Sequence, residues 1–263
     1  ADRLEAEPPR TVEANRALQM DVYSEFAASV LPVMIQGAVA PSDKQQAFLR
    51  SLAAWDYVME ADKAEPLMFA LWVRIFSRRL YADETGDFYS RLADPRQVLT
   101  GASDAWCDDI TTTDKTETCG DILTESLNET AGYFSDDLKG VTWGDRHHAV
   151  FSHPILQYVP VISGFAVLLA PTSGGFATLN RGSYGRDRSG TSFPHIHGAG
   201  YRAVYDLSSQ ETATVIIAGG QSGNHYRDLM GRWLSDDRLT YSTLPGRFPG
   251  SPHQQLELMS TDD

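Results

Sequence analysis

Residues 201–218 read YRAVYDLSSQETATVIIA and predict two β-strands, over 201–207 and 212–218, separated by a polar loop. The run Val215–Ile217 is continuously apolar, as in a strand that is buried on both faces. A further strand is expected over 175–180, and glycines and β-branched residues dominate after Gly140. The segment 141–263 is therefore expected to be strand-rich. So few strands with glycine-rich edges make a poor free-standing sheet, which favours their joining a larger one.

The segment 1–140 is instead expected to be mainly helical. Apolar residues recur at helical spacing over four stretches, at 11–32, 42–59, 65–80 and 122–138. Thr11 and Ser42 suit the N-caps of the first two helices. The third stretch is apolar nearly all round, so its helix should be buried on more than one side. Residues 225–234 predict a closing helix, and helices followed by strands indicate the α+β class.

Composition excludes several kinds of protein. The formal net charge is −13 and the 22 basic residues are scattered, which argues against nucleic-acid binding. The longest apolar run, 159–170, is too short to cross a membrane.

The two cysteines, Cys107 and Cys119, lie in a polar stretch rich in Thr and Asp. Free cysteines favour apolar sites, so this setting favours a disulfide that closes a short loop and contributes about 3 kcal/mol to stability. The alternative is a pair of unpaired surface thiols. A disulfide favours a periplasmic or secreted location.

A serine hydrolase is one catalytic hypothesis. Gly220-Gln221-Ser222-Gly223 lies between a predicted strand and a predicted helix, as a nucleophile elbow does, and Asp228 and His253 follow in triad order. However, Asn224 stands where the elbow pattern needs a second glycine. The alternative is a glycine-assisted turn in which Ser222 caps the helix.

Other polar groups suggest weaker sites. In an extended strand His195 and His197 would share one face, as the first two ligands of a metal do, although no third ligand follows. Asp145 and His147 could form an acid–base pair. Three arginines of one glycine-rich loop could hold an anion, or could simply be solvated: Arg181, Arg186 and Arg188.

Four blocks in order resemble the penicillin acylase family. They are WGDRHHAVFSHP at 143–154, GGFATLN at 174–180, GYRAVYDLS at 200–208 and AGGQSGNHYRD at 218–228. The first half is similar more loosely, through ADR at 1–3, RALQMD at 16–21 and LAAWD at 52–56. The resemblance extends over nearly the whole chain and is strongest from Trp143 to Trp233.

The resemblance implies an N-terminal-nucleophile amide hydrolase with an αββα sandwich of two antiparallel sheets. In such an enzyme the N-terminal Ser of the large subunit attacks an N-acyl substrate, its own α-amine acts as base, and an Asn and backbone N–H groups stabilise the oxyanion. The substrate types implied are acylated penicillins or cephalosporins and N-acyl-homoserine lactones. Ser222 becomes a structural turn residue in this interpretation.

The match aligns Ala1 downstream of the nucleophile, the oxyanion Asn and the family's usual calcium ligands. We therefore expect no catalytic residue, metal or cofactor in this chain, with calcium bound elsewhere in the complete enzyme. Arg3 alone falls where the family carries an arginine that supports the active site. The expected partners are the small subunit and the N-terminal part of the large subunit, and the isolated chain is expected to be inactive. The alternatives are a non-catalytic structural or binding domain on the acylase scaffold, or a serine hydrolase using Ser222.

Overall fold

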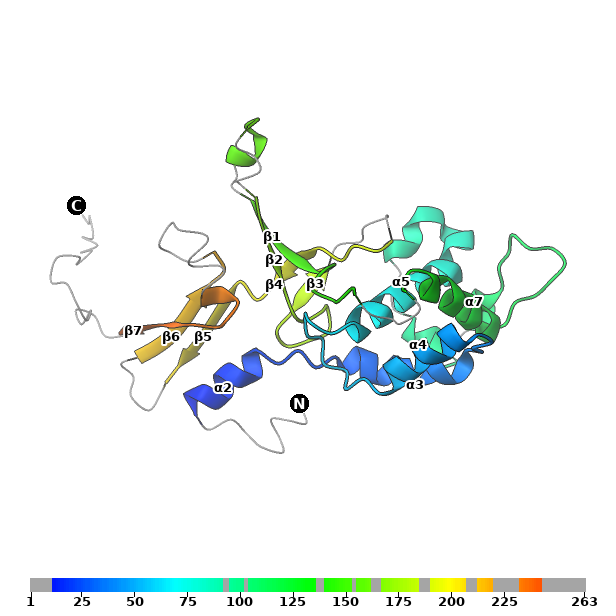
Figure 1. Cartoon of the computed structure of the whole chain (residues 1–263), viewed down its shortest axis with the longest axis horizontal. Helices are drawn as coiled ribbons and strands as arrows, with labels where there is room; N and C mark the ends of the chain where they lie inside the picture. Colours follow the sequence, from blue (N-terminus) through cyan, green and yellow to red (C-terminus); the bar gives the residue numbers. More distant parts are fainter. Residues whose placement is uncertain are drawn as a thin grey trace, which may run out of the picture. The chain divides into compact units, whose positions relative to one another are not determined.

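The structure is a computed structural model that describes residues 11–91, 95–101, 104–135, 140–152, 155–161, 167–184, 190–206, 212–219 and 232–242. It separates into two compact units, one formed by 21–198 and the other by 1–20 with 199–263. The helices are α2 Val12–Gln19, α3 Glu25–Gly37, α4 Asp43–Ala53, α5 Glu65–Thr85, α6 Arg96–Leu99 and α7 Cys119–Gly132 (Figure 1). The strands are β1 His148–Ser152, β2 Val167–Pro171, β3 Gly182–Tyr184, β4 His195–Gly198, β5 Tyr201–Tyr205, β6 Thr212–Ile217 and β7 Leu239–Ser242. Helices therefore precede strands, and the expected α+β class is confirmed. The assignment of 1–140 and 141–263 as two separate domains stays a prediction.

Helix α5 is the centre of the larger unit. Trp72, Phe76 and Leu80 have no exposed surface, and buried side chains occur on all sides of the helix, as its sequence predicts. Helix α7 packs along it, and the Trp72 indole N–H donates a 2.9 Å hydrogen bond to the Ser126 hydroxyl. Helices α3 and α4 also contact α7, so one apolar core joins the four helices. No described helix is both long enough and apolar enough to traverse a lipid bilayer.

The expected single helix over 11–32 is wrong in both its continuity and its end. The chain leaves the helical conformation after α2 because the Asp21 carboxylate accepts the Tyr23 N–H and Tyr23 bridges to Val58. Ser24 then caps α3 by accepting the Ala27 N–H, and α3 continues through Pro32 to Gly37.

The second and fourth helices also differ from their expected bounds. A capping box of Ser42 and Gln45 starts α4 as predicted, but the helix ends at Ala53. Trp55 and Met59 lie beyond that end and are nevertheless buried. A second capping box, formed by Thr118 and Asp121, starts α7 earlier than its apolar pattern indicates. The predicted helix at 225–234 lies almost entirely outside the described residues.

Two sheets hold the strands, one in each unit. The larger unit has the order β2-β1-β4-β3, and the smaller has β5-β6-β7, which is antiparallel throughout. Strands β5 and β6 are found where the sequence predicts them. The four-stranded sheet departs from the antiparallel expectation, because β1 and β4 pair in parallel through Ala149 and His195.

The strand expected over 175–180 is instead a tight turn. The Thr178 hydroxyl accepts the Gly175 N–H, which folds the segment back on itself. Gly174 has a φ of +91° and donates to the Met59 carbonyl, and a Cβ on Gly175 would lie 2.6 Å from the Met59 sulfur. The glycines therefore serve close packing over Met59, which a strand pattern does not reveal.

Candidate functional site

Trp143 anchors the first of the four sequence blocks in the larger unit. Its indole is fully buried and donates a 2.9 Å hydrogen bond to the Gly174 carbonyl. The turn that carries it is fixed by backbone bonds from Trp143 N–H to Lys63 and from Gly144 N–H to Ala61. A side chain at Gly144 would come within 2.9 Å of the Ala61 carbonyl. The first two blocks, at 143–154 and 174–180, thus meet at one buried contact.

Three aromatic rings stack beside this contact. The His147 imidazole lies 4.4 Å from the Trp143 ring and 5.1 Å from the His195 ring, nearly parallel to both. Its Nδ1 lies 2.7 Å from the Phe193 carbonyl, which can only accept, so Nδ1 carries the proton. The Nε2 atom is buried and has no hydrogen-bond partner in the described part of the chain. It faces Gly182, where any Cβ would approach within 2.7 Å.

Burial controls the charge of this cluster. Removal from water lowers the pKa of His147 to about 3. The bond to the Phe193 carbonyl acts in the opposite direction, whereas the neighbouring His195 and His148 lower the pKa further. Burial also lowers the pKa of His195. Both imidazoles are therefore neutral near pH 7.

A hydroxyl and an imidazole lie side by side in the same cluster. The Thr172 Oγ1 is 2.9 Å from the His195 Nδ1, the distance of a nucleophile–base pair. Thr172 is 6% exposed and His195 9% exposed, so neither group is open to a substrate. The cluster joins β1, β4 and the 172–182 turn.

The expectation that His195 and His197 share a face is wrong. The pairing of β3 with β4 shifts register between Ser183 and Tyr184, so Ile196 is an extra residue that breaks the alternation. His195 is consequently buried while His197 is exposed. No group of three potential metal ligands is found among the described residues.

Asp145 does not contact His147. Its carboxylate accepts both the N–H and the hydroxyl of Thr142, and these bonds lower the pKa of Asp145. Its role is to close the turn before Trp143, so the acid–base pair suggested by the sequence is not formed.

The remaining candidates divide by where they lie. Arg181 is exposed and donates to the Ser183 hydroxyl at 2.6 Å. The other residues singled out from sequence lie outside the described residues: Arg3, Arg186, Arg188, Ser222, Asp228 and His253.

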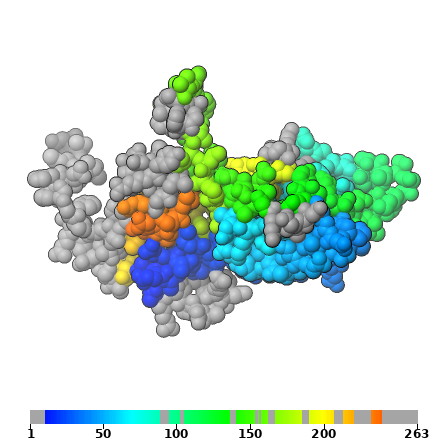
Figure 2. All heavy atoms as spheres, in the orientation of Figure 1, coloured from blue at the N-terminus to red at the C-terminus, as the bar shows by residue number. Residues whose placement is uncertain are grey.

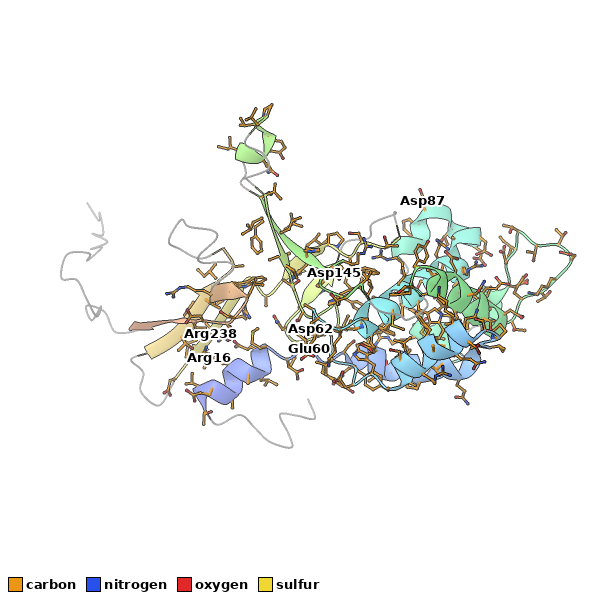
Figure 3. The ribbon with its side chains drawn as sticks, in the orientation of Figure 1. Arg16, Glu60, Asp62, Asp87, Asp145 and Arg238 are labelled. Carbon is orange, nitrogen blue, oxygen red and sulfur yellow. A yellow bond between two sulfur atoms is a disulfide. The ribbon has the colours of Figure 1, made fainter. Side chains whose placement is uncertain are left out.

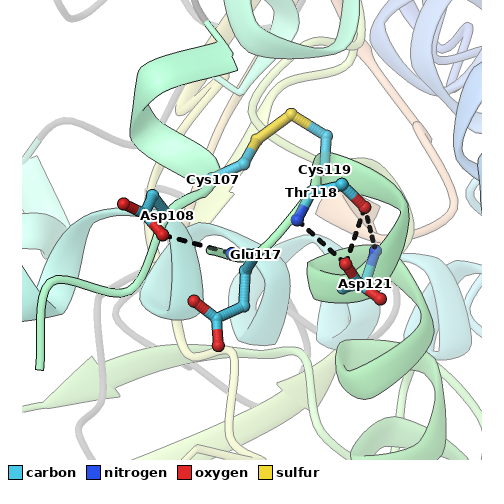
Figure 4. The surroundings of a disulfide bond; sticks show 6 residues. All are labelled: Cys107, Asp108, Glu117, Thr118, Cys119 and Asp121. Carbon is cyan, nitrogen blue, oxygen red and sulfur yellow. Dashed lines mark hydrogen bonds between the residues drawn. A yellow bond between two sulfur atoms is a disulfide. The ribbon is translucent and has the colours of Figure 1, made fainter. Parts of the chain in front are cut away.

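Cys107 and Cys119 form the expected disulfide (Figure 4). Beside it the Asp108 carboxylate accepts the Glu117 N–H at 3.1 Å, and Asp121 accepts the N–H of the cap residue Thr118. Cys107 itself is buried against the helical core, although its neighbours in the sequence are polar. The bond therefore ties the loop before α7 to the core.

Reduction of this disulfide, or the double change C107S/C119S, is expected to lower the free energy of unfolding by about 3 kcal/mol, because the unfolded chain regains the freedom of the closed loop. Urea denaturation with and without reductant measures the difference. The double variant is the control, because it should no longer respond to reductant. Equal midpoints for oxidised and reduced wild type would contradict the prediction.

The sequence suggested pairing His195 with His197 and His147 with Asp145, and it did not reveal the stack of Trp143, His147 and His195. It also missed a buried cluster of arginines around Asp236 in the smaller unit. The blocks shared with the acylase family could have pointed to both clusters. Trp143 and His147 lie in the block 143–154, and Arg202 lies in the block 200–208.

Residues 1–246 match the penicillin amidase family. The match covers most of the 263 residues, and the chain belongs to this family. Membership suggests hydrolysis of an acyl amide, in agreement with the resemblance of the blocks and with the α+β fold.

Proposed function

We propose that this chain is a part of a larger exported acyl-amide hydrolase, in which another segment supplies the nucleophile. The single observation that carries the proposal is the family match over 1–246. The buried histidine cluster supports it, because the one close hydroxyl–imidazole pair described in the larger unit is closed to substrate. The chain then contributes scaffold to the acylase, and the acyl group removed belongs to an N-acyl compound of the penicillin, cephalosporin or homoserine-lactone type.

An exposed apolar face supports the need for a partner. Val150 and Leu169 pair across β1 and β2 and are 46% and 56% exposed, on the side away from the buried pair Ala149 and Ala170. Ile196 of β4 is also exposed. Apolar side chains gathered on a sheet face mark a surface that another element covers.

Exposed apolar side chains also occur in the connection between the antiparallel strands β1 and β2. Ile155, Tyr158 and Val161 follow β1 and are 69%, 79% and 93% exposed. This segment projects from the rest of the larger unit in the space-filling view (Figure 2). Among the described strands β2 is also the edge of its sheet, so its outer backbone groups can pair with a further strand.

The catalytic half of the proposal is tested with a chromogenic N-acyl amide. The purified chain should show no hydrolysis, and the same chain combined with the remainder of its acylase should hydrolyse the amide. Turnover by the isolated chain would overturn the proposal and favour a hydrolase centred on Ser222. An S222A variant that retains full activity in the combined enzyme would exclude that alternative.

The change Leu169→Asp is expected to reduce assembly with the remainder of the acylase at least tenfold, because it places a charge on the apolar face that becomes buried. The matched control is Leu179→Asp, since Leu179 is 62% exposed and lies in the 174–180 turn, outside strands β1 and β2. Recovered activity and native mass measure assembly. Equal recovery of the two variants would remove the β1–β2 face from the interface.

Location in the periplasm or outside the cell is part of the same proposal. The disulfide supports it, because such bonds persist in oxidising compartments. Fractionation of the source cells with the chain detected by antibody tests it, and recovery in the cytosol alone would contradict it.

A further inference from the structure

The smaller unit contains a group of arginines around one carboxylate. The Nε of Arg238 donates to both oxygens of Asp236, at 3.1 and 3.0 Å. Arg202 Nη1 lies 3.4 Å from one of these oxygens, and Arg16 Nε lies 3.7 Å from the other. Arg16 and Arg238 are labelled in Figure 3, on α2 and beside β7. Three guanidinium groups thus approach a single carboxylate, and the described cluster has an excess of positive charge.

The cluster is buried in addition to having an excess of positive charge. The side chains of Arg238 and Arg202 are 0% and 4% exposed, and that of Asp236 is 10% exposed. Asp236 holds its position in the left-handed backbone region, with a φ of +55°, which Asp tolerates better than most residues. The carboxylate is therefore fixed in the turn before β7.

The terminal atoms of Arg238 are the notable feature. Because Nε is used for Asp236, the Nη1 and Nη2 atoms point elsewhere, and both are buried with no hydrogen-bond partner in the described residues. These two atoms form the parallel fork with which a guanidinium binds a carboxylate in bidentate fashion. A buried charged donor without an acceptor is costly, so this fork indicates an acceptor that the described residues do not supply.

Neighbouring polar atoms are also left without partners. Arg202 pairs with Ile216 across β5 and β6, and Thr214 is two residues from Ile216, so Arg202 and Thr214 share a sheet face. The Thr214 hydroxyl and the Arg202 Nε are both buried and unpaired in the described residues. Arg202 otherwise donates to the Trp233 carbonyl at 2.6 Å. In the described part of the smaller unit, the buried polar atoms left without partners are three guanidinium nitrogens, the Thr214 hydroxyl and one acceptor, the Gln19 Oε1. Donors are in excess, which suits an anionic oxygen ligand.

We propose that Arg238, with Arg202 and Thr214 beside it, forms a binding site for a second carboxylate. A carboxylate fits because it is planar, accepts two parallel N–H bonds and offsets the excess positive charge. It could belong to a small free acid or to an acidic side chain of the remainder of the acylase. Only the second source rests on the proposed function.

The test is the melting temperature of the full purified chain during titration with sodium formate, at constant ionic strength maintained with sodium chloride. Formate should raise the melting temperature saturably by about 3 °C in the wild type, because it binds the folded state alone. Arg238→Met should abolish this rise. In chloride alone this variant should melt no lower than the wild type, because it removes a buried guanidinium whose two terminal nitrogens lack acceptors, while Asp236 keeps Arg202 and Arg16.

The matched control is Arg232→Met, since Arg232 lies on the same turn but pairs with Asp237 and is 29% exposed. This variant should keep the full response to formate. Absence of a formate response in the wild type, an equal response in Arg238→Met, or a response to phosphate but not to formate would each overturn the proposal. If Arg238→Met fails to fold, isothermal titration of formate into the wild type replaces the comparison, and no saturable binding overturns the proposal.

Repeating the titration on the combined acylase identifies the source of the carboxylate. Loss of the formate response on assembly assigns the site to an acidic side chain of the partner segment. A response retained after assembly supports a small free acid. The formate titration of the isolated chain tests the carboxylate site whether or not the chain assembles with a partner. Failure of the proposed function can therefore be distinguished from failure of the carboxylate site.

Discussion

Replacement of Trp143 with alanine is expected to lower the free energy of unfolding by about 3–5 kcal/mol, the largest single-residue effect that we predict. The indole is completely buried and stacks on His147, so its loss leaves a cavity at the junction of the first two blocks. Loss of the indole N–H also leaves the Gly174 carbonyl without the donor that it has in the wild type. Urea denaturation of the full chain, followed by circular dichroism, measures the loss.

Trp143→Phe separates packing from hydrogen bonding. It keeps most of the aromatic volume and removes only the indole N–H, so its cost should be clearly smaller than that of alanine. Trp106→Ala is a second comparison, because Trp106 is only partly buried and contacts Tyr81 at the edge of the core. A Trp143→Ala variant no less stable than Trp106→Ala would show that the blocks do not depend on this contact.

Acid should destabilise the protein through His147. The folded pKa of about 3 lies below the ordinary value of 6.5, so protons bind the unfolded chain more readily. The stabilisation is fully present above pH 6.5 and is lost as the pH falls from 6.5 towards 3. From the size of this shift the full loss is of the order of 5 kcal/mol. His195 contributes in the same direction because burial lowers its pKa too.

Denaturation midpoints measured from pH 7 to pH 4 test this, with His147→Phe as the informative variant. It should be somewhat less stable at pH 7, where the bond to the Phe193 carbonyl is missing, but its stability should fall less steeply with acid. His148→Gln is the matched control, because His148 is the adjacent residue and is less buried. Parallel pH profiles for wild type and His147→Phe would assign the acid sensitivity to other groups.

The sequence predicted well the elements whose signal is local. The apolar run at 65–80 indicates a helix buried on several sides, and α5 is that helix. Ser42 indicates the start of α4, and the alternating and β-branched runs of 201–207 and 212–218 locate β5 and β6. In each case the residues that determine the element lie within it or directly next to it.

The features that were missed depend on residues far apart in the chain. Gly175 is needed because Met59, more than a hundred residues earlier, packs against its backbone. The bulge at Ile196 arises from pairing with β3 and turns His195 inward while His197 stays exposed. The Asp236 cluster joins Arg16, Arg202 and Arg238 from three separate segments. No periodicity within one segment contains that information.

Covalent labelling of the active acylase tests most directly whether another segment supplies the nucleophile. The combined enzyme is treated with a sulfonyl fluoride that reacts with activated hydroxyl nucleophiles, until amide hydrolysis ceases, and the intact mass of each polypeptide is then measured. The account predicts that the label lies on the partner segment and that this chain keeps its mass of 29.0 kDa. A label on this chain that appears in step with the loss of activity would contradict the account.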